Sequence, residues 1–431
     1  MSTVAFLNIG MHGRVNPTLP VVAELVRRGH SVSYHTSPAF RAEIEAAGAT
    51  VHLYSGGEQP LPDPPTPVAL LEGLAQTAVR VLPGVLDDLR DVRPDLIVHD
   101  AACLWGAVAA RELGVPAVSS FTTFAFNRQV PSPTGASKDL LLAAAARPSV
   151  IQGYVKARWE LHRRYDARRL PVVDLGNITQ PLNLVYTSRM FQPGVEELDQ
   201  SYRFIGPSIG ARPPDPSFPA NRLRDPVLYV SLGTVFKAAP QLLRTFANAL
   251  SPLGGTVVVA TGQTDPVALA PLPPNVLVRR SVPQLAVLDR AALFVTHGGM
   301  NSVNEAMYAG VPMLVVPQGA DQPLVAGRVA GLGAGLSINT EDVGEESVRA
   351  LAWKLLDGSR FLGAATTLQA AQREAGGFHR AVDELELHLK TTGAVDRTPV
   401  DQTRVDQTSV DRTGVDETRV DQARVDPAPG G

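Results

Sequence analysis

The sequence has little of what several classes of protein require. Its 431 residues include a single cysteine, Cys103, so no disulfide can form within the chain and a reducing compartment is expected. Charged residues make up 19% and the net charge is -3, which argues against a basic surface for nucleic acid or an anionic membrane. No stretch reaches the roughly 18 apolar residues of a membrane span, and no positively charged leader opens the chain. We therefore expect a cytoplasmic protein without nucleic-acid or membrane partners.

Hydrophobic residues, at 44% of the chain, are abundant enough to form the cores of two α/β domains. The first apolar segment, Val4–Ile9, has a strand pattern, and a loop and a helical pattern over Pro17–Arg28 follow it. Further strands are predicted at Ser31–His35, Val51–Tyr54, Leu96–His99 and Ala117–Ser120. Strands that alternate with helices in this way predict a doubly wound parallel sheet with helices on both faces.

A second series of strands starts after residues 206–222, a segment rich in proline and glycine. Its strands are predicted at Val227–Ser231, Val257–Ala260, Val276–Val278, Leu293–Thr296 and Met313–Val316, and helices are predicted from Glu345 to Leu389. The chain is thus predicted to form a Rossmann-like N-terminal domain (1–205), a linker (206–222) and a Rossmann-like C-terminal domain (223–390). Ligands bind at the carboxyl ends of parallel strands, so we expect a cleft between the two sheets.

The composition changes completely after Gly393. Val-Asp recurs every five residues from Val395 to Val425, with Thr, Gln and Arg between. This period fits neither a helix nor a strand with one apolar face, and isolated valines cannot build a core. Residues 391–431 are therefore predicted to be a disordered tail that the chemistry does not need.

The most informative stretch begins where the strand Leu293–Thr296 ends. His297, Gly298 and Gly299 form a turn, and Asn301 and Ser302 then open a helix. Such a turn leaves backbone N–H groups free at the positive end of the helix dipole, and the three polar side chains add donors. The pattern predicts a phosphate site.

Other polar residues are predicted at the same edge of the sheet. Glu305 lies in the first turns of that helix, where a carboxylate can accept from the hydroxyls of a ribose. Asp321 and Gln322 follow the next strand and can bind sugar hydroxyls. Ser231, Gly233 and Thr234 follow the first strand of this domain and suit contact with a diphosphate.

This stretch resembles the nucleotide-sugar signature of glycosyltransferases that act on small lipophilic molecules. The matching residues are Pro283-Gln284, His297-Gly298-Gly299, Asn301-Ser302, Glu305, Gly310-Val311-Pro312, Pro317 and Asp321-Gln322. Up to about Lys390 the chain resembles the bacterial macrolide-type family of the UDP-glycosyltransferase superfamily, with HGRVNPTLP, PDLIVHD, YRFIGP and LYVSLGT as further matches. The resemblance implies a GT-B fold, donor contacts by Gln284 and by the backbone near Val282, and a last helix that returns to the N-terminal domain.

The first loop holds the candidate catalytic base. His12 follows the first strand, so it lies at the carboxyl edge, and histidine is the natural base near neutral pH. Glycosyl transfer requires a base that takes the proton of the attacking hydroxyl. Asp100 ends a strand at the same edge and is expected to orient His12 and stabilise its cation.

Two positions depart from the family. Many relatives carry a histidine, often assigned as the base, where this chain has Arg14, whose guanidinium stays protonated. Many also carry an aromatic residue, which stacks on the nucleobase, where this chain has Ser281. We therefore assign the base to His12 and leave nucleobase selectivity open.

The residues that bind the acceptor are harder to identify from the sequence. A lipophilic acceptor needs apolar pocket walls, and Met11, Phe121 and Phe124 lie on neighbouring edges where they can provide them. Most other aromatic residues in 121–180 are expected to pack in the core.

The resemblance implies an inverting transferase that moves a hexose, expected to be glucose, from a UDP-sugar to a hydroxyl of a macrolide, phenolic or other lipophilic natural product. That activity suits antibiotic resistance or biosynthesis. No metal or other cofactor is expected, because no Asp-x-Asp lies near the diphosphate site and the helix terminus supplies the counter-charge.

Alternatives remain. The donor could be a dTDP-deoxysugar, the chain could be a sugar-nucleotide epimerase, or Arg14 and Ser281 could mark a decayed transferase that only binds a ligand. Dinucleotide oxidoreduction is disfavoured, because the first βα turn lacks G-x-G-x-x-G. The sequence does not indicate an oligomeric state.

Overall fold

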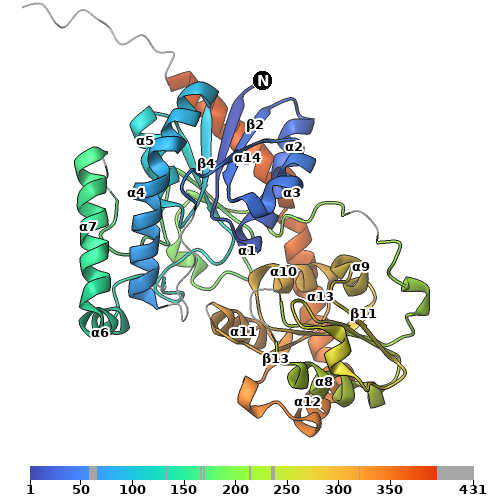
Figure 1. Ribbon diagram of the computed structural model, residues 1–431. Coiled ribbons are helices and arrows are strands. Elements are labelled where there is room, and N and C mark those ends of the chain that lie inside the picture. The colour runs from blue at the N-terminus through green and yellow to red at the C-terminus, as the bar shows by residue number, and fades with distance from the viewer. Residues whose placement is uncertain are drawn as a thin grey trace, which may run out of the picture. The chain divides into compact units, whose positions relative to one another are not determined.

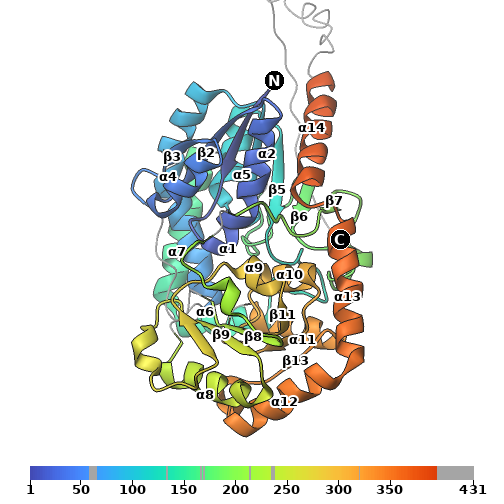
Figure 2. The same ribbon diagram turned by 90° about the vertical axis from the view of Figure 1, so that its right-hand side faces the viewer.

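Two all-parallel β-sheets organise the protein (Figures 1 and 2). They are seen in a computed structural model that describes residues 1–57, 66–132, 134–165, 167, 170–212, 215–233, 238–319 and 321–395. The first sheet has seven strands in the order β3-β2-β1-β4-β5-β6-β7, and the second has six in the order β10-β9-β8-β11-β12-β13. Each order reverses beside the first strand of its series, which confirms the predicted doubly wound α/β architecture.

The elements of the first half of the chain, with their bounds, are β1 (Thr3–Leu7), α1 (His12–Val15), α2 (Leu19–Arg27), β2 (Ser31–Thr36), α3 (Arg41–Ala46), β3 (Thr50–Leu53), α4 (Pro67–Val92), β4 (Leu96–Asp100), α5 (Leu104–Leu113), β5 (Ala117–Phe121), α6 (Lys138–Ala146), α7 (Pro148–Arg164), β6 (Leu182–Val185) and β7 (Tyr202–Phe204). Those of the second half are β8 (Val227–Ser231), α8 (Pro240–Leu250), β9 (Thr256–Ala260), β10 (Val276–Arg279), α9 (Gln284–Leu288), β11 (Ala291–Thr296), α10 (Met300–Ala309), β12 (Met313–Val315), α11 (Gln322–Gly331), β13 (Gly335–Ser337), α12 (Glu345–Asp357), α13 (Ser359–Glu374) and α14 (Gly377–Val395).

Alternate residues of β1 enter different cores, as expected of a strand that is buried on both faces. Ala5 and Leu7 belong to a cluster that α4, α5 and α7 complete. Val4 and Phe6 belong to a cluster on the opposite face, which α2 and α14 cover (Figure 1). The continuous apolar runs of these strands are therefore explained by helices on both faces of the sheet.

Most predicted strands are found within one or two residues of their predicted bounds. The short strands β6, β7 and β13 and the long helix α4 were not predicted. The three missed strands are short, and Asn183, Arg203 and Gly335 interrupt their apolar pattern. The segment 10–16, predicted as a loop, contains the one-turn helix α1.

Helix α4 is long and apolar enough to cross a membrane by length and composition, with a mean hydropathy of 1.3. This corrects the expectation that no stretch has this character. Many of its apolar side chains between Val68 and Leu89 are buried in the core beneath the first sheet, where α4 packs on α5 and α7, and 44% of the apolar window is buried. Burial inside the protein accounts for its hydropathy.

The helix α14 packs on the first sheet, although it follows the second in sequence. Ala381, Val382 and Leu385 lie in the same core cluster as Val4 and Phe6. By their internal contacts, residues 1–389 form one unit, so the domain limits 1–205, 206–222 and 223–390 stay predictions. The predicted disordered tail lies outside the described residues from residue 396 onward.

A buried polar network joins α10 to the first half of the chain. The Asn304 side chain accepts from Thr187 Oγ1 at 2.9 Å and donates to the Tyr186 carbonyl at 2.9 Å. Gln372 of α13 donates to Asn304 Oδ1 at 3.2 Å and accepts from the Ser188 N–H at 2.9 Å. All five residues are at most 3% exposed. A polar group that lost its hydrogen bond here could not bind water instead, and this loss would destabilise the fold.

We predict that Asn304→Ala lowers the free energy of unfolding by about 2–3 kcal/mol, because the buried Tyr186 carbonyl loses the donor, and the buried Thr187 hydroxyl the acceptor, that Asn304 supplies. Guanidinium unfolding followed by circular dichroism measures the change. Asn301→Ala, on the same helix but partly exposed, is the control and should cost well under half as much. Equal losses in the two variants would show that the network contributes nothing beyond an ordinary surface amide.

Candidate active site

The turn between β11 and α10 is built around the imidazole of His297. A Cβ atom on Gly299 would lie 2.4 Å from His297 Nε2, and one on Gly233 would lie 2.8 Å from His297 Cε1. Gly233 and Gly298 have φ values of +83° and +89°, in the left-handed region that favours glycine. These glycines therefore let the ring lie between the loops that follow β8 and β11.

Burial lowers the pKa of His297, and the nearby Asp321 opposes this effect. The imidazole is therefore neutral at neutral pH and can donate one N–H bond. Helix α10 starts directly after the turn, and its N-cap residue, Gly299, has no side chain with which to cap it. Asn301 and Ser302 lie in the first turn and are partly exposed. Free N–H groups at the positive end of a ten-residue helix suit an anion such as a phosphate.

The carboxylate of Glu305, one turn further along α10, is already engaged. Gln284 Nε2 donates to Glu305 Oε2 at 2.7 Å, and Arg212 donates to Oε1. Tyr229 Oη in turn donates to Gln284 Oε1 at 2.9 Å. The structure thus brings together Glu305 and Gln284, two residues predicted to contact the donor. It adds Arg212, which would have to release Glu305 before a ribose could bind there.

Asp321 and Gln322 lie at the start of α11, on the same sheet edge. Gln322 is buried, and its Oε1 accepts from the backbone N–H groups of Gln318 and Gly319 at 2.8 and 3.3 Å. Its side chain therefore shapes the loop after β12. Asp321 is partly exposed, and its carboxylate accepts from Thr123 Oγ1 at 2.8 Å.

The remaining predicted donor residues surround this turn. Ser231 ends β8 and is partly exposed, whereas Thr234 lies outside the described residues. Val282 is partly buried and packs on the core beneath the second sheet. Ser281 beside it is exposed. The position at which relatives stack an aromatic ring is therefore solvent-facing and occupied by a hydroxymethyl group.

On the first sheet, the predicted pairing of His12 with Asp100 is wrong for this structure. Arg14 Nη1 donates to Asp100 Oδ2 at 3.1 Å and to Thr122 Oγ1 at 3.3 Å. The other oxygen, Asp100 Oδ1, accepts from the Ala102 N–H at 2.8 Å. His12 is exposed, and its ring meets the Phe40 ring edge-on at a centroid distance of 4.9 Å. Asp100 pairs with Arg14 rather than with His12 because the permanent charge of the guanidinium stabilises a carboxylate that is only 1% exposed.

Asn8 explains why Arg14 points to Asp100. Its Nδ2 donates to the Arg14 carbonyl at 3.0 Å and to Tyr34 Oη at 2.8 Å, while Tyr54 Oη donates to the Asn8 carbonyl at 2.9 Å. These bonds fix the short helix α1 over the end of β1. Arg14 is thereby held over the carboxyl end of β4, and His12, two residues earlier, projects to solvent.

The predicted acceptor contacts of Phe121 and Phe124 are also corrected. Phe121 is fully buried and packs against Tyr202, with ring centroids 5.8 Å apart. Phe124 is 1% exposed and packs on Phe191. Phe121 is the last residue of β5, and Phe124 lies three residues beyond it; both rings are enclosed by their neighbours, so neither is available to a ligand. Met11 is partly exposed at the start of α1 and remains a candidate.

The carboxyl ends of the two sheets approach each other at two hydrogen bonds. Asn301 Nδ2 donates to the Gly13 carbonyl at 3.4 Å, and Thr123 Oγ1 donates to Asp321 at 2.8 Å. The first joins the anion-binding turn to the loop that carries His12. The structure therefore brings the turn before α10 close to the segment that carries His12.

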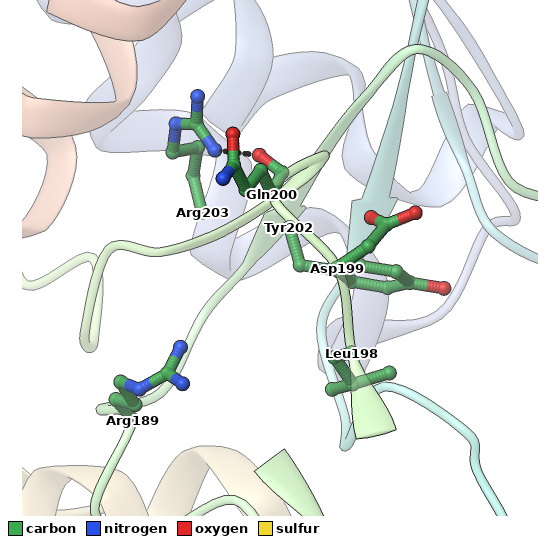
Figure 3. A pocket seen from close by; sticks show the side chains of 6 residues that line it. All are labelled: Arg189, Leu198, Asp199, Gln200, Tyr202 and Arg203. Carbon is green, nitrogen blue, oxygen red and sulfur yellow. Dashed lines mark hydrogen bonds between the residues drawn. The ribbon is translucent and has the colours of Figure 1, made fainter. Parts of the chain in front are cut away.

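A separate pocket lies at the edge strand β7 and contains none of the predicted residues. Figure 3 shows its lining, which includes Arg189, Asp199, Tyr202 and Arg203. Arg203 donates to the Gln200 carbonyl and pairs with a glutamate of α14 at 3.1 Å. Because Arg203 ties β7 to α14 through this ion pair, we regard the pocket as structural.

Comparison with known proteins agrees with this geometry. A model of the family described as UDP-glucoronosyl and UDP-glucosyl transferase matches residues 223–374. NDP-glycosyltransferase YjiC of Bacillus subtilis (strain 168) is 32% identical over 396 residues, which cover 90% of this chain and 97% of that protein. The chain belongs to the UDP-glycosyltransferase superfamily. Oleandomycin glycosyltransferase of Streptomyces antibioticus is also 32% identical to it, over 403 residues that cover 90% of each protein.

Solved structures place this glycosyltransferase in the GT-B fold. The glycosyltransferase of kitacinnamycin superposes with a TM-score of 0.77 at 29% identity, over 89% of this chain and 98% of that chain. CalG4, the calicheamicin glycosyltransferase, superposes with a TM-score of 0.74 at 31% identity, over 91% of this chain and 99% of that chain. The match over nearly the whole of each relative indicates that both halves of the fold are shared.

Three site residues escaped sequence reasoning. Arg212 lies in a proline-rich segment interpreted as a linker, and its contact with Glu305 spans 93 positions. Thr123 and Asp321 are 198 positions apart. From the sequence, Arg14 is expected to be unable to act as a base and able to hold a phosphate or an acceptor, but its pairing with Asp100 is not expected. Nothing in a local pattern reports such long-range partners.

We predict that His297→Ala in this glycosyltransferase weakens binding of UDP about ten- to a hundredfold, because one polar contact to the diphosphate is lost. Isothermal titration with UDP measures the affinity. His379→Ala, which alters a mostly exposed histidine of α14, is the control and should bind UDP as the wild type does. Unchanged affinity in folded His297→Ala protein would exclude the turn as the diphosphate site.

Proposed function

We propose that this glycosyltransferase moves a hexose, most simply glucose, from a UDP-sugar to a hydroxyl of a lipophilic natural product, with inversion at the anomeric carbon. The observation that carries the proposal is the uncapped start of α10 beside the neutral His297, joined through Asn301 to the loop of His12. An anion site therefore lies next to an exposed imidazole. The names of the oleandomycin and calicheamicin enzymes support a natural product as the acceptor, and we propose a macrolide or a phenolic.

In the proposed reaction, the acceptor oxygen forms a bond to the anomeric carbon while the bond to the diphosphate oxygen breaks. The hydroxyl proton passes to His12, and the electron pair of the broken bond leaves with UDP. The N–H groups at the start of α10 and the His297 imidazole stabilise the developing charge on the diphosphate. A single displacement of this kind inverts the anomeric centre.

The pair formed by Arg14 and Asp100 has a different role in this proposal. Since Asp100 binds Arg14 rather than His12, it orients the base only by fixing the loop that carries it. His12 then works as a solvated imidazole without a carboxylate partner, for which a modest rate is expected. Arg14 also leaves a positive charge near the site, which can hold the acceptor or a phosphate.

A second candidate donor is a dTDP-deoxysugar. Ser281 gives no stacking surface that would select uracil, and a solved relative of the same fold, VinC, was crystallised with dTDP. Parallel assays with UDP-glucose and with dTDP-sugars, on macrolide and phenolic acceptors, decide between the donors. Absence of turnover with every pair, with UDP still bound, would favour a transferase that has lost its activity.

We predict that His12→Ala lowers turnover about a hundredfold while UDP affinity stays within about twofold of the wild type. The reason is that His12 touches the acceptor and not the donor. Initial rates and titration with UDP separate the two effects. His30→Ala, which alters a histidine that pairs with Glu386 away from the site, is the control. Full activity of His12→Ala on every acceptor would show that the base lies elsewhere.

We predict that Arg14→His is tolerated and does not lower the rate, because it places an imidazole beside Asp100 in the arrangement that the family's usual histidine implies. In that background, Asp100→Asn should reduce turnover more than it does alone, since Asp100 would then orient a base directly. Rates of the two single variants and the double variant measure this coupling. Additive effects would contradict it.

We predict that transfer continues at its full rate in EDTA, because the diphosphate is neutralised by α10 and His297 rather than by a divalent ion. The assay uses enzyme dialysed against EDTA, with Mg²⁺ or Mn²⁺ restored in a parallel sample. Loss of activity in EDTA that a divalent ion reverses would contradict the proposed role of the helix terminus.

A further inference from the structure

Three side chains that could bind a metal converge on the first sheet, on strands and a helix that carry none of the donor residues. They are His35 of β2, His52 of β3 and Asp88 of α4. His35 and His52 are direct neighbours in the register of the two parallel strands, so both project from one face of the sheet. Helix α4 covers that face of the sheet, and Asp88 extends from α4 toward the two histidines. The ligand atoms of the three residues all lie within 4.8 Å of one another.

His35 is the unusual member of this group. It is fully buried, and within the described residues neither of its ring nitrogens makes a hydrogen bond of ordinary geometry, the main chain of Phe6 being at most a weak partner. A buried polar group without a partner destabilises the fold unless something else satisfies it. A buried ring nitrogen that lacks a good partner in the protein is available to a cation.

The distances are close to those of a coordination shell. Asp88 Oδ2 lies 3.6 Å from His35 Nε2 and 3.7 Å from His52 Nδ1. Ligand atoms about 2.0–2.2 Å from a tetrahedral Zn²⁺ are separated from one another by about 3.4 Å. The imidazole planes are nearly parallel, at 16°, so one ring must turn to place both lone pairs on a single ion. His52, with 24% of its side chain exposed, has the freedom to do so, whereas His35 is enclosed.

We propose that His35, His52 and Asp88 form a site for a transition-metal dication, with Zn²⁺ as the best-fitting ion. Two imidazoles and one carboxylate are a common zinc donor set, and water completes the shell on the side where Asp88 is 40% exposed. The bound ion joins the edge strand β3 to β2 and α4, and so stabilises the first sheet. This role is independent of sugar transfer, since none of the three residues belongs to the proposed active site.

The test uses full-length, untagged protein that has been treated with EDTA and dialysed free of it. Zn²⁺ is titrated by calorimetry, and Co²⁺ is titrated while visible absorption is recorded, because tetrahedral Co²⁺ gives intense bands that report nitrogen and oxygen ligands. We expect one ion per chain. We also expect a rise in the melting temperature of about 3 °C at a hundredfold excess over the dissociation constant.

Asp88→Asn and His52→Gln are the informative variants, because both residues are partly exposed and should fold without their ligand groups. Each should weaken Zn²⁺ binding at least about tenfold and abolish the thermal shift. Asp87→Asn removes the neighbouring carboxylate, which pairs with Arg90 on the surface of α4, and is the matched control. It should bind Zn²⁺ as the wild type does.

His35→Gln is added as a third variant, with circular dichroism to verify that it folds. Zn²⁺ affinity that is equal in the wild type, Asp88→Asn and His52→Gln would overturn the proposal, as would the absence of a stoichiometric Co²⁺ spectrum. UDP titration on the same samples should give unchanged affinity in Asp88→Asn. Failure of the metal site can therefore be distinguished from failure of the proposed donor site.

Discussion

The buried amide network around Asn304 is the constraint on which the site depends. Helix α10 brings its free N–H groups to the donor site, and that site can face the His12 loop only if α10 is fixed against the first half of the chain. Apolar packing alone allows helices to slide, whereas a buried amide must meet its partners or lose several kilocalories per mole. The bonds of Asn304 to Tyr186, Thr187 and Gln372 therefore set the register between the two halves.

The donor and acceptor sides of the site are built on different electrostatic principles. On the donor side, two glycines admit a neutral histidine and leave an uncapped helix terminus, so the attraction for phosphate comes from dipoles that are fixed before the ligand arrives. On the acceptor side, a full charge on Arg14 is neutralised by Asp100. The pair is satisfied without a ligand, which makes this loop well ordered but removes the carboxylate that a histidine base would use.

Much of the fold could be predicted from the sequence, because the information lies in short segments. Apolar runs of four to six residues between helical patterns suffice for a doubly wound parallel sheet, and the carboxyl-edge rule then places His12, Asp100, Ser231 and His297 at the ends of their strands. The glycines around His297 are predictable for the same reason, since a tight turn into a helix needs them. The strands β6, β7 and β13 were not predicted because a polar residue or a glycine interrupts the apolar pattern of each short segment.

What the sequence by itself determined is the set of groups available at each sheet edge. Only the tertiary structure decided how those groups pair, because an ion pair joins residues that are close in space whatever their separation along the chain. Asp100 could pair with His12 or with Arg14. The hydrogen bond from Asn8 to the Arg14 carbonyl fixes α1 so that Arg14 pairs with Asp100. Glu305 is held by a distant arginine, Phe121 packs against Tyr202 of β7, and Phe124 packs against Phe191 of the segment between β6 and β7. Which side chains pair depends on their distances in the folded protein and on how far they are removed from water. A local pattern of residues determines neither.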